Sequence, residues 1–134
     1  MKYVAIVWVL VALFTVAQPG STRASENEQL VLIETLHQYL KEGSTEAILN
    51  LFTAPLLTQK EGLLENNPAY AQFLRETYAN STLYVNKIDR LNDSECTVDV
   101  QFNLVGENQK LQTRFVLNRQ NGIWKVADEM ILED

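Results

Sequence analysis

Alternating apolar and polar residues in the last third of the chain limit the folds that this sequence can adopt. Val98, Val100 and Phe102 are separated by polar residues, which is the two-residue period of a strand with one buried face. Two more apolar runs follow, and between them stands Asn121-Gly122, a dipeptide that readily takes the positive φ angles of a tight hairpin turn. The pattern predicts a curved sheet whose antiparallel strands follow one another as a meander.

The residues upstream of these strands predict a fourth strand and, before it, three helices. The strand is expected over 83–91. Capping residues, a terminating glycine and two prolines predict helices over 25–43, 44–54 and 67–80. The stretch 56–65 is poorly periodic, so we expect a loop or a helical turn there. The fold class is therefore α+β, with three N-terminal helices packed in the concave face of a curved four-stranded antiparallel sheet.

Residues 1–24 have the features of a secretory signal peptide. Lys2 precedes an uncharged apolar run of 14 residues, which is shorter than the roughly 20 residues that a membrane-spanning helix needs. Small residues suited to signal peptidase end at Ala17 and at Ala24. We expect an exported protein, periplasmic or secreted, with a single mature domain over 25–134 and no stable membrane anchor after cleavage. A retained N-terminal anchor is the alternative.

The charge and the cysteine and histidine content narrow the classes of partner. The chain carries a formal net charge of −6 at pH 7 without basic clusters, which argues against nucleic acid and anionic membranes as partners. Cys96 is the only cysteine, so no intramolecular disulfide can form, and its place in the alternation predicts a packed, inward-facing thiol. With His37 as the single histidine, no histidine cluster can form a zinc site, and we expect neither a metal nor a cofactor.

Two short segments resemble the nuclear transport factor two-like superfamily. Residues 45–52 (TEAILNLF) resemble the segment that opens these domains, and residues 121–126 (NGIWKV) resemble their closing hairpin. The resemblance implies a cone-like domain in which a curved sheet wraps around helices and leaves a pocket at the wide end. It leaves the function open, because the superfamily includes isomerases, dehydratases and polyketide cyclases as well as non-catalytic binding domains. Its enzymes often carry an acidic residue in the loop after the second helix, whereas 53–57 (TAPLL) contains none.

Few residues are candidates for a functional site. Asp128 continues the inward alternation from Trp124 and would point toward the wide end of the cone, where an apolar pocket would raise its pKa and make it a base. The alternative is a solvated carboxylate at a frayed strand end. His37 borders the apolar stripe of the first helix, where packing is the alternative to catalysis. The candidate ligand-pocket residues are aromatic: Tyr39, Tyr70, Tyr78, Phe102 and Trp124.

These observations favour an exported, non-enzymatic binding or accessory domain that takes a small apolar ligand or a protein partner. The alternative is a small isomerase, dehydratase or hydrolase that uses Asp128 together with His37 or a tyrosine. A homodimer through the outer sheet face would be wet and weak, because the outward residues of the strands are polar. These residues are Thr97, Asp99, Gln101, Asn103, Gln112 and Arg114.

Overall fold

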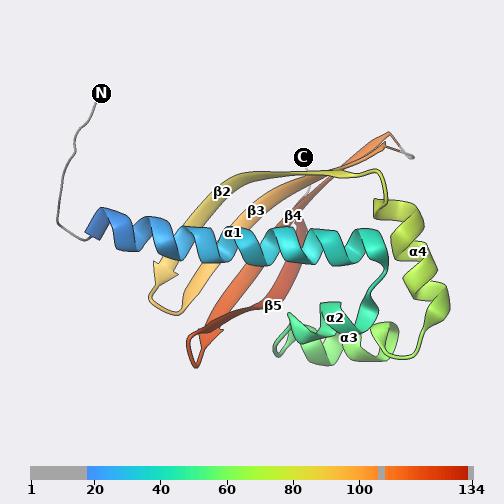
Figure 1. The fold of residues 1–134 in the computed structure, drawn as a ribbon, viewed down its shortest axis with the longest axis horizontal. Coiled ribbons are helices and arrows are strands. Elements are labelled where there is room, and N and C mark those ends of the chain that lie inside the picture. Colours follow the sequence, from blue (N-terminus) through green and yellow to red (C-terminus); the bar gives the residue numbers. More distant parts are fainter. Residues whose placement is uncertain (1–17, 106–107, 133–134) are drawn as a thin grey trace. The chain divides into compact units, whose positions relative to one another are not determined.

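The structure is a computed structural model that describes residues 18–105 and 108–132. The chain divides into two compact units, residues 1–30 and residues 31–134. The described part of the first unit, residues 18–30, is helical. The second unit holds the rest of that helix and every other described element (Figure 1). The helices are α1 (Gln18–Glu42), α2 (Thr45–Asn50), α3 (Leu56–Leu64) and α4 (Pro68–Tyr78). The strands are β2 (Thr82–Asn92), β3 (Glu95–Leu104), β4 (Gln109–Gln120) and β5 (Ile123–Leu132).

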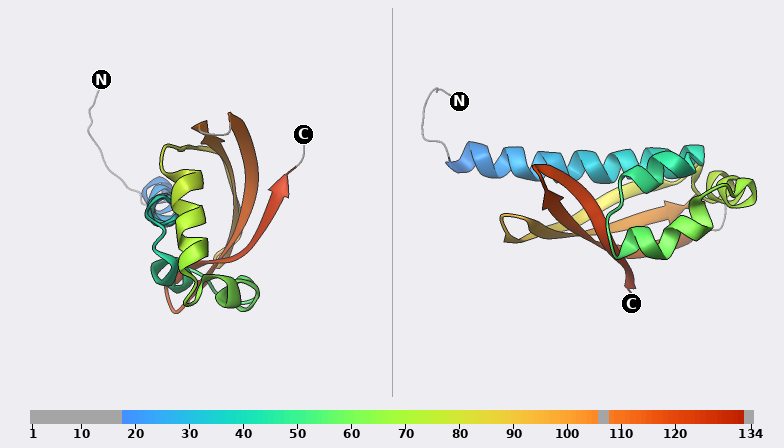
Figure 2. Two further views of the ribbon diagram at one scale, coloured as in Figure 1. Left: turned by 90° about the vertical axis from the view of Figure 1, so that its right-hand side faces the viewer. Right: turned by 90° about the horizontal axis from the view of Figure 1, so that it is seen from below.

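The four strands form one antiparallel sheet in the order β2-β3-β4-β5, which confirms the predicted meander. The turn between β4 and β5 is the predicted Asn121-Gly122 dipeptide, with φ angles of 54° and 78°. The sheet is curved, and the helices of the second unit lie on its concave face (Figure 2). This arrangement confirms the α+β class and the predicted placement of the helices.

A bulge interrupts the alternation of β5 close to its middle. Val126 pairs with Leu117, but the next pair on the sheet joins Asp128 to Val116, so Ala127 is an extra residue in β5. Val126 and Ala127 are consecutive and both buried, which a regular strand with one buried face does not allow. The two faces of β5 are therefore exchanged, relative to the sequence alternation, from Asp128 onward.

The described residues contain four helices rather than the predicted three. The additional helix is α3, which covers the stretch expected to be a loop or a helical turn. Leu56 and Leu64 at its two ends are both buried, so tertiary packing stabilises a helix whose own sequence is weakly periodic. The first helix also begins earlier than predicted, at Gln18 rather than at Ser25.

Two of the predicted boundary signals act as expected, whereas α2 ends at Asn50 rather than at residue 54, and Ser44 before it makes no side-chain capping hydrogen bond. Gly43 follows α1 with a φ of 68°, in the left-handed region that glycine adopts at little cost. Asn67 caps α4, because its Oδ1 accepts a hydrogen bond from the backbone N–H of Tyr70 at 3.1 Å. Gly43 thus marks the end of α1, and Asn67 marks the start of α4.

The core lies between the helices and the concave face of the sheet. The inward residues of β3 are buried without exception, from Cys96 to Leu104, as their alternation predicts. The predicted apolar run and the cleavage position after Ala17 lie outside the described residues, and the position after Ala24 lies within α1. Within the described residues no helix is long and apolar enough to cross a membrane.

Candidate functional site

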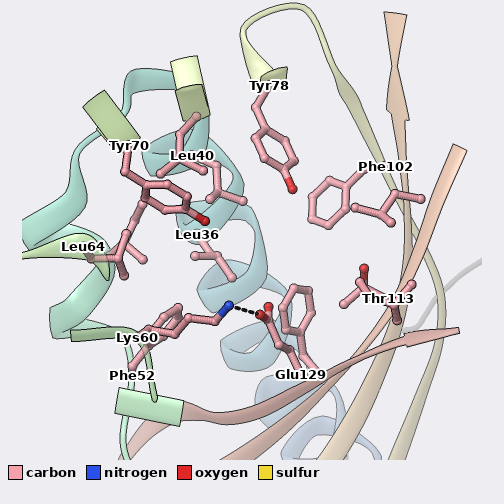
Figure 3. A pocket seen from close by; sticks show the side chains of 15 residues that line it. Leu36, Leu40, Phe52, Lys60, Leu64, Tyr70, Tyr78, Phe102, Thr113 and Glu129 are labelled. Carbon is pink, nitrogen blue, oxygen red and sulfur yellow. Dashed lines mark ion pairs between the residues drawn. The ribbon is translucent and has the colours of Figure 1, made fainter. Parts of the chain in front are cut away.

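A cavity of about 130 Å³ lies between the helices and the sheet of the second unit. Its walls come from the C-terminal half of α1, from α2, α3 and α4, and from the three strands β3, β4 and β5. Most of the lining side chains are aliphatic or aromatic (Figure 3). They include Leu36, Leu64, Leu74, Phe102, Phe115 and Ile131. A concave, mostly apolar cavity with a few polar groups is the usual form of a small-molecule site.

Polar groups reach this cavity from both sides. The hydroxyl groups of Tyr70 and Tyr78 point into it from α4 (Figure 3). Thr113 lines it from β4, and Lys60 and Glu129 lie at one wall. The site therefore offers hydrogen-bonding groups at several points around an apolar centre.

Lys60 and Glu129 form an ion pair that joins α3 to β5. The Lys60 Nζ lies 3.1 Å from Glu129 Oε2. Both side chains are about one-third exposed, at 31% and 32%. Partial solvation reduces the energy of such a pair to at most about 1 kcal/mol. Its main effect here is to balance the two charges at the wall of the cavity.

Thr113 is the most deeply buried polar residue of the cavity lining. The residue is 2% exposed and faces the concave side of the sheet, opposite Ile131 on β5. Its hydroxyl has no hydrogen-bond partner among the described residues. Leaving a buried hydroxyl without a partner costs about 1–3 kcal/mol. The sequence signal for this residue was a threonine on the inward alternation of β4, between Leu111 and Phe115, and the prediction overlooked it.

Glu129, not Asp128, brings a carboxylate to the cavity, so the predicted orientation of Asp128 is wrong. The bulge at Ala127 turns Asp128 to the outer side of the sheet, where it pairs with Val116. Its Oδ1 accepts a hydrogen bond from the backbone N–H of Glu129 at 2.9 Å. Uniform alternation from Trp124 predicted the opposite, because nothing in the sequence marks the extra residue.

His37 lies outside the cavity lining and ties α1 to the turn after α4. Its Nε2 lies 2.8 Å from the Ser81 Oγ, which itself donates to the carbonyl oxygen of Tyr78 at 2.7 Å. The Ser81 hydroxyl has one proton, so His37 donates from Nε2. Burial, assisted by the nearby charge of Lys41, lowers the pKa of His37. These contacts favour the packing role that was the alternative to catalysis.

The structure brings three of the five predicted aromatic pocket residues together. Tyr70, Tyr78 and Phe102 line the cavity, and the rings of Tyr78 and Phe102 meet edge to face at 5.4 Å between centroids. Tyr39 packs against the core and Trp124 is buried, and neither is part of this lining. A functional role for these residues stays a prediction.

The cysteine and the acidic residues add no second site within the described part of the chain. Cys96 is fully buried, and burial raises the pKa of its thiol to about 11, so the thiol stays protonated at neutral pH. Within 18–105 and 108–132, no group of three or more histidine, cysteine, aspartate or glutamate side chains is placed to hold a metal ion.

Comparisons with known proteins agree on the fold. No protein-family profile matches the sequence, and no curated protein matches it. An NTF-2-like protein of unknown function from Shewanella oneidensis MR-1 is similar in structure, with a TM-score of 0.60 and 8% identity over 80% of this chain and 98% of that one. A de novo designed protein with a curved β-sheet has a TM-score of 0.50 and 13% identity over 79% and 100% of the two chains.

A candidate scytalone dehydratase from Novosphingobium aromaticivorans is also similar. Its TM-score is 0.50, with 14% identity over 85% of this chain and 87% of that one. At such low identities the likeness concerns the fold alone. The predicted nuclear transport factor two-like fold is thereby confirmed.

Proposed function

We propose that this protein is a non-enzymatic binding domain and that its ligand is a small apolar molecule held in the cavity between the helices and the sheet. The observation that carries the proposal is the cavity itself, about 130 Å³ in volume and lined mostly by apolar side chains. An engineered apolar cavity of about 150 Å³ in another protein binds benzene. A cavity of this size therefore suits a molecule with one small ring.

The charges of the site favour binding over catalysis. The loop between α2 and α3, residues 51–55, carries no acidic residue. The carboxylate of Glu129, which lines the cavity, is held by Lys60 at 3.1 Å. This ion pair occupies one of the two carboxylate oxygens of Glu129. Ligand binding thus needs no rearrangement of this pair, whereas proton abstraction would compete with it.

An enzyme of the isomerase or dehydratase type is the second candidate. Glu129 would replace Asp128 as its base, and a hydroxyl from Tyr70 or Tyr78 would be the second group, since all three line the same cavity. One substitution distinguishes the enzyme from the binding domain. Glu129→Gln would abolish an enzymatic activity, whereas a binding domain would retain its affinity for an apolar ligand.

The binding proposal is tested at the rim of the cavity. Ile131 lines the cavity and is 59% exposed, so tryptophan at this position narrows the entrance without filling the core. We expect Ile131→Trp to weaken toluene binding by roughly tenfold, measured by titration of backbone amide NMR shifts. Ile123→Trp is the matched control, because Ile123 lies on the same strand with the same 59% exposure but outside the cavity. Equal toluene binding by the two variants, or none by the native protein, would contradict the proposal.

We further propose that the protein is exported, as the apolar run near its N-terminus suggests. Intact-mass measurement of the chain recovered outside the cytoplasm should show a start at Gln18 or Ser25. A recovered chain that still begins at Met1 would contradict cleavage. A protein partner, expected above as the other kind of ligand, stays a prediction.

A further inference from the structure

We propose that Thr113 recognises the ligand and that the ligand is an uncharged, single-ring molecule carrying one hydroxyl or carbonyl oxygen. This inference rests on the proposed binding function and specifies the chemistry of the same cavity. Its basis is the juxtaposition of a buried hydroxyl, a balanced pair of charges and a small apolar volume.

The position of Thr113 is unusual for a hydroxyl group. Its neighbours on the concave face of β4 are Leu111 and Phe115, and its cross-strand partner on β5 is Ile131. At 2% exposure the side chain is fully enclosed, yet no described residue accepts from its hydroxyl or donates to it. Valine has nearly the same shape and would avoid the loss of hydrogen bonding. A threonine here is therefore best explained by a partner that arrives with the ligand.

The hydroxyl groups of Tyr70 and Tyr78 are weaker evidence for the chemistry of the ligand than the hydroxyl group of Thr113. Tyr78 contributes a ring that packs edge to face against Phe102, and Tyr70 stacks on Phe73. These rings contribute to packing whatever their hydroxyls do. At Thr113 the hydroxyl is the main difference from an apolar residue of equal size, so its presence reports on the ligand more directly.

The charges at the cavity wall favour a neutral ligand. Among the described lining residues, Lys60 and Glu129 are charged, and they already neutralise one another at 3.1 Å. A ligand carboxylate would have to displace Glu129 from Lys60, and a ligand ammonium group would have to displace Lys60 from Glu129. A neutral molecule leaves this pair intact and needs only the hydrogen bond that Thr113 offers.

The test compares toluene, phenol and benzoate on the native protein, on three threonine variants, and on Ile131→Trp and Lys60→Met. We expect Thr113→Val to raise the ratio of the phenol Kd to the toluene Kd by roughly three- to tenfold, which is the contribution of one hydrogen bond. Thr113→Ser restores the hydroxyl and should bring the ratio back toward the native value. Thr97→Val makes the same chemical change on the opposite face of the sheet, at a partly exposed residue, and should leave the ratio unchanged. Thermal melting of each variant confirms that it is folded before affinities are compared.

The outcomes separate this inference from the function on which it rests. An unchanged ratio in Thr113→Val, with toluene binding still sensitive to Ile131→Trp, overturns the assignment of Thr113 and leaves the binding proposal standing. Benzoate binding tighter than phenol, with that preference lost in Lys60→Met, overturns the neutral ligand. Absence of binding by all three compounds overturns the binding proposal and this inference together.

Discussion

Thr113 links stability to the proposed function at the scale of one residue. A hydroxyl that is buried to 2% exposure without a partner among the described residues destabilises the fold when no ligand is bound. Groups kept at a cost to stability are common where a protein binds or reacts. The side chain that makes the cavity selective would thus be one that the isolated fold does not need.

Thr113→Val should therefore raise the free energy of unfolding in the absence of ligand by about 1 kcal/mol, because the unsatisfied hydroxyl becomes a methyl group of similar size. Urea denaturation followed by far-ultraviolet circular dichroism measures the change. Thr97→Val, at a partly exposed position on the other face, should stay within roughly 0.5 kcal/mol of the native value. A loss of stability in Thr113→Val would show that the hydroxyl is hydrogen-bonded in the ligand-free protein.

His37 gives the fold a dependence on pH of known sign. Burial, assisted by Lys41, lowers its pKa in the folded protein, so the unfolded chain binds the proton first as the pH falls. The contribution of neutral His37 to stability is complete above the unfolded pKa of about 6.5 and is lost as the pH falls toward the lower folded value. His37→Gln keeps a donor for Ser81 but cannot titrate. The variant should show a flatter stability profile between pH 7 and pH 5.5, measured by urea denaturation at each pH. A native profile that rises as the pH falls through this window would contradict this assignment.

Elements that are determined by sequence signals within a few residues were predicted correctly. The alternation from Val98 to Phe102, the turn at Asn121-Gly122 and the cap at Asn67 each act within a few residues, and each prediction is confirmed. The helix α3 has a buried leucine at each end, and Val126, next to the bulge in β5, exchanges backbone hydrogen bonds with Leu51 and Thr53. These are contacts between residues distant in the sequence, and both features were missed. The identity of the carboxylate in the cavity follows from the bulge. The sequence therefore predicted the architecture well and the site only in part.

Gly43 shows how one turn sets the contact between two elements. Its φ is 68°, and a Cβ added there would lie 2.5 Å from the carbonyl oxygen of Ala71 on α4. Gly43→Ala should lower the free energy of unfolding by at least about 2 kcal/mol, since it adds a steric clash to an unfavourable backbone conformation. Gly122→Ala is the control, because its φ of 78° is similar but no atom lies within 4 Å of the added Cβ.

Chemical denaturation of the two variants separates these effects. The difference between them measures the close approach of α4 to the turn after α1. Equal destabilisation would show that the backbone conformation alone requires glycine at Gly43 and that α4 moves aside at little cost.

At the scale of the whole molecule, the outer face of the sheet bears on self-association. On this face Asp99 and Arg114 are cross-strand partners joined by two hydrogen bonds of 2.7 and 2.9 Å. The guanidinium group of Arg114 lowers the pKa of Asp99, so the pair remains charged in mildly acidic conditions. Each of these charges is already paired within the chain, so the pair would contribute little electrostatic attraction to a second copy of the protein.

Light scattering after size-exclusion chromatography should accordingly give the mass of one chain at micromolar concentrations, with any dimer confined to higher concentrations. A polar, hydrated interface is expected to bind weakly. A stable dimer at low micromolar concentration, disrupted by Arg114→Ala, would contradict this expectation and assign the outer face to assembly.

The extra residue at Ala127 has a consequence for comparing this chain with its structural neighbours. In a neighbour whose strand lacks the extra residue, the position equivalent to Glu129 would come one residue earlier in the sequence. An ungapped alignment would therefore pair that residue with Asp128 instead of Glu129. Sequence alignment alone would then identify the wrong acidic residue as the one lining the cavity in one of the two proteins. Superposition of the strands, with a gap allowed at the insertion, is what makes their cavities comparable.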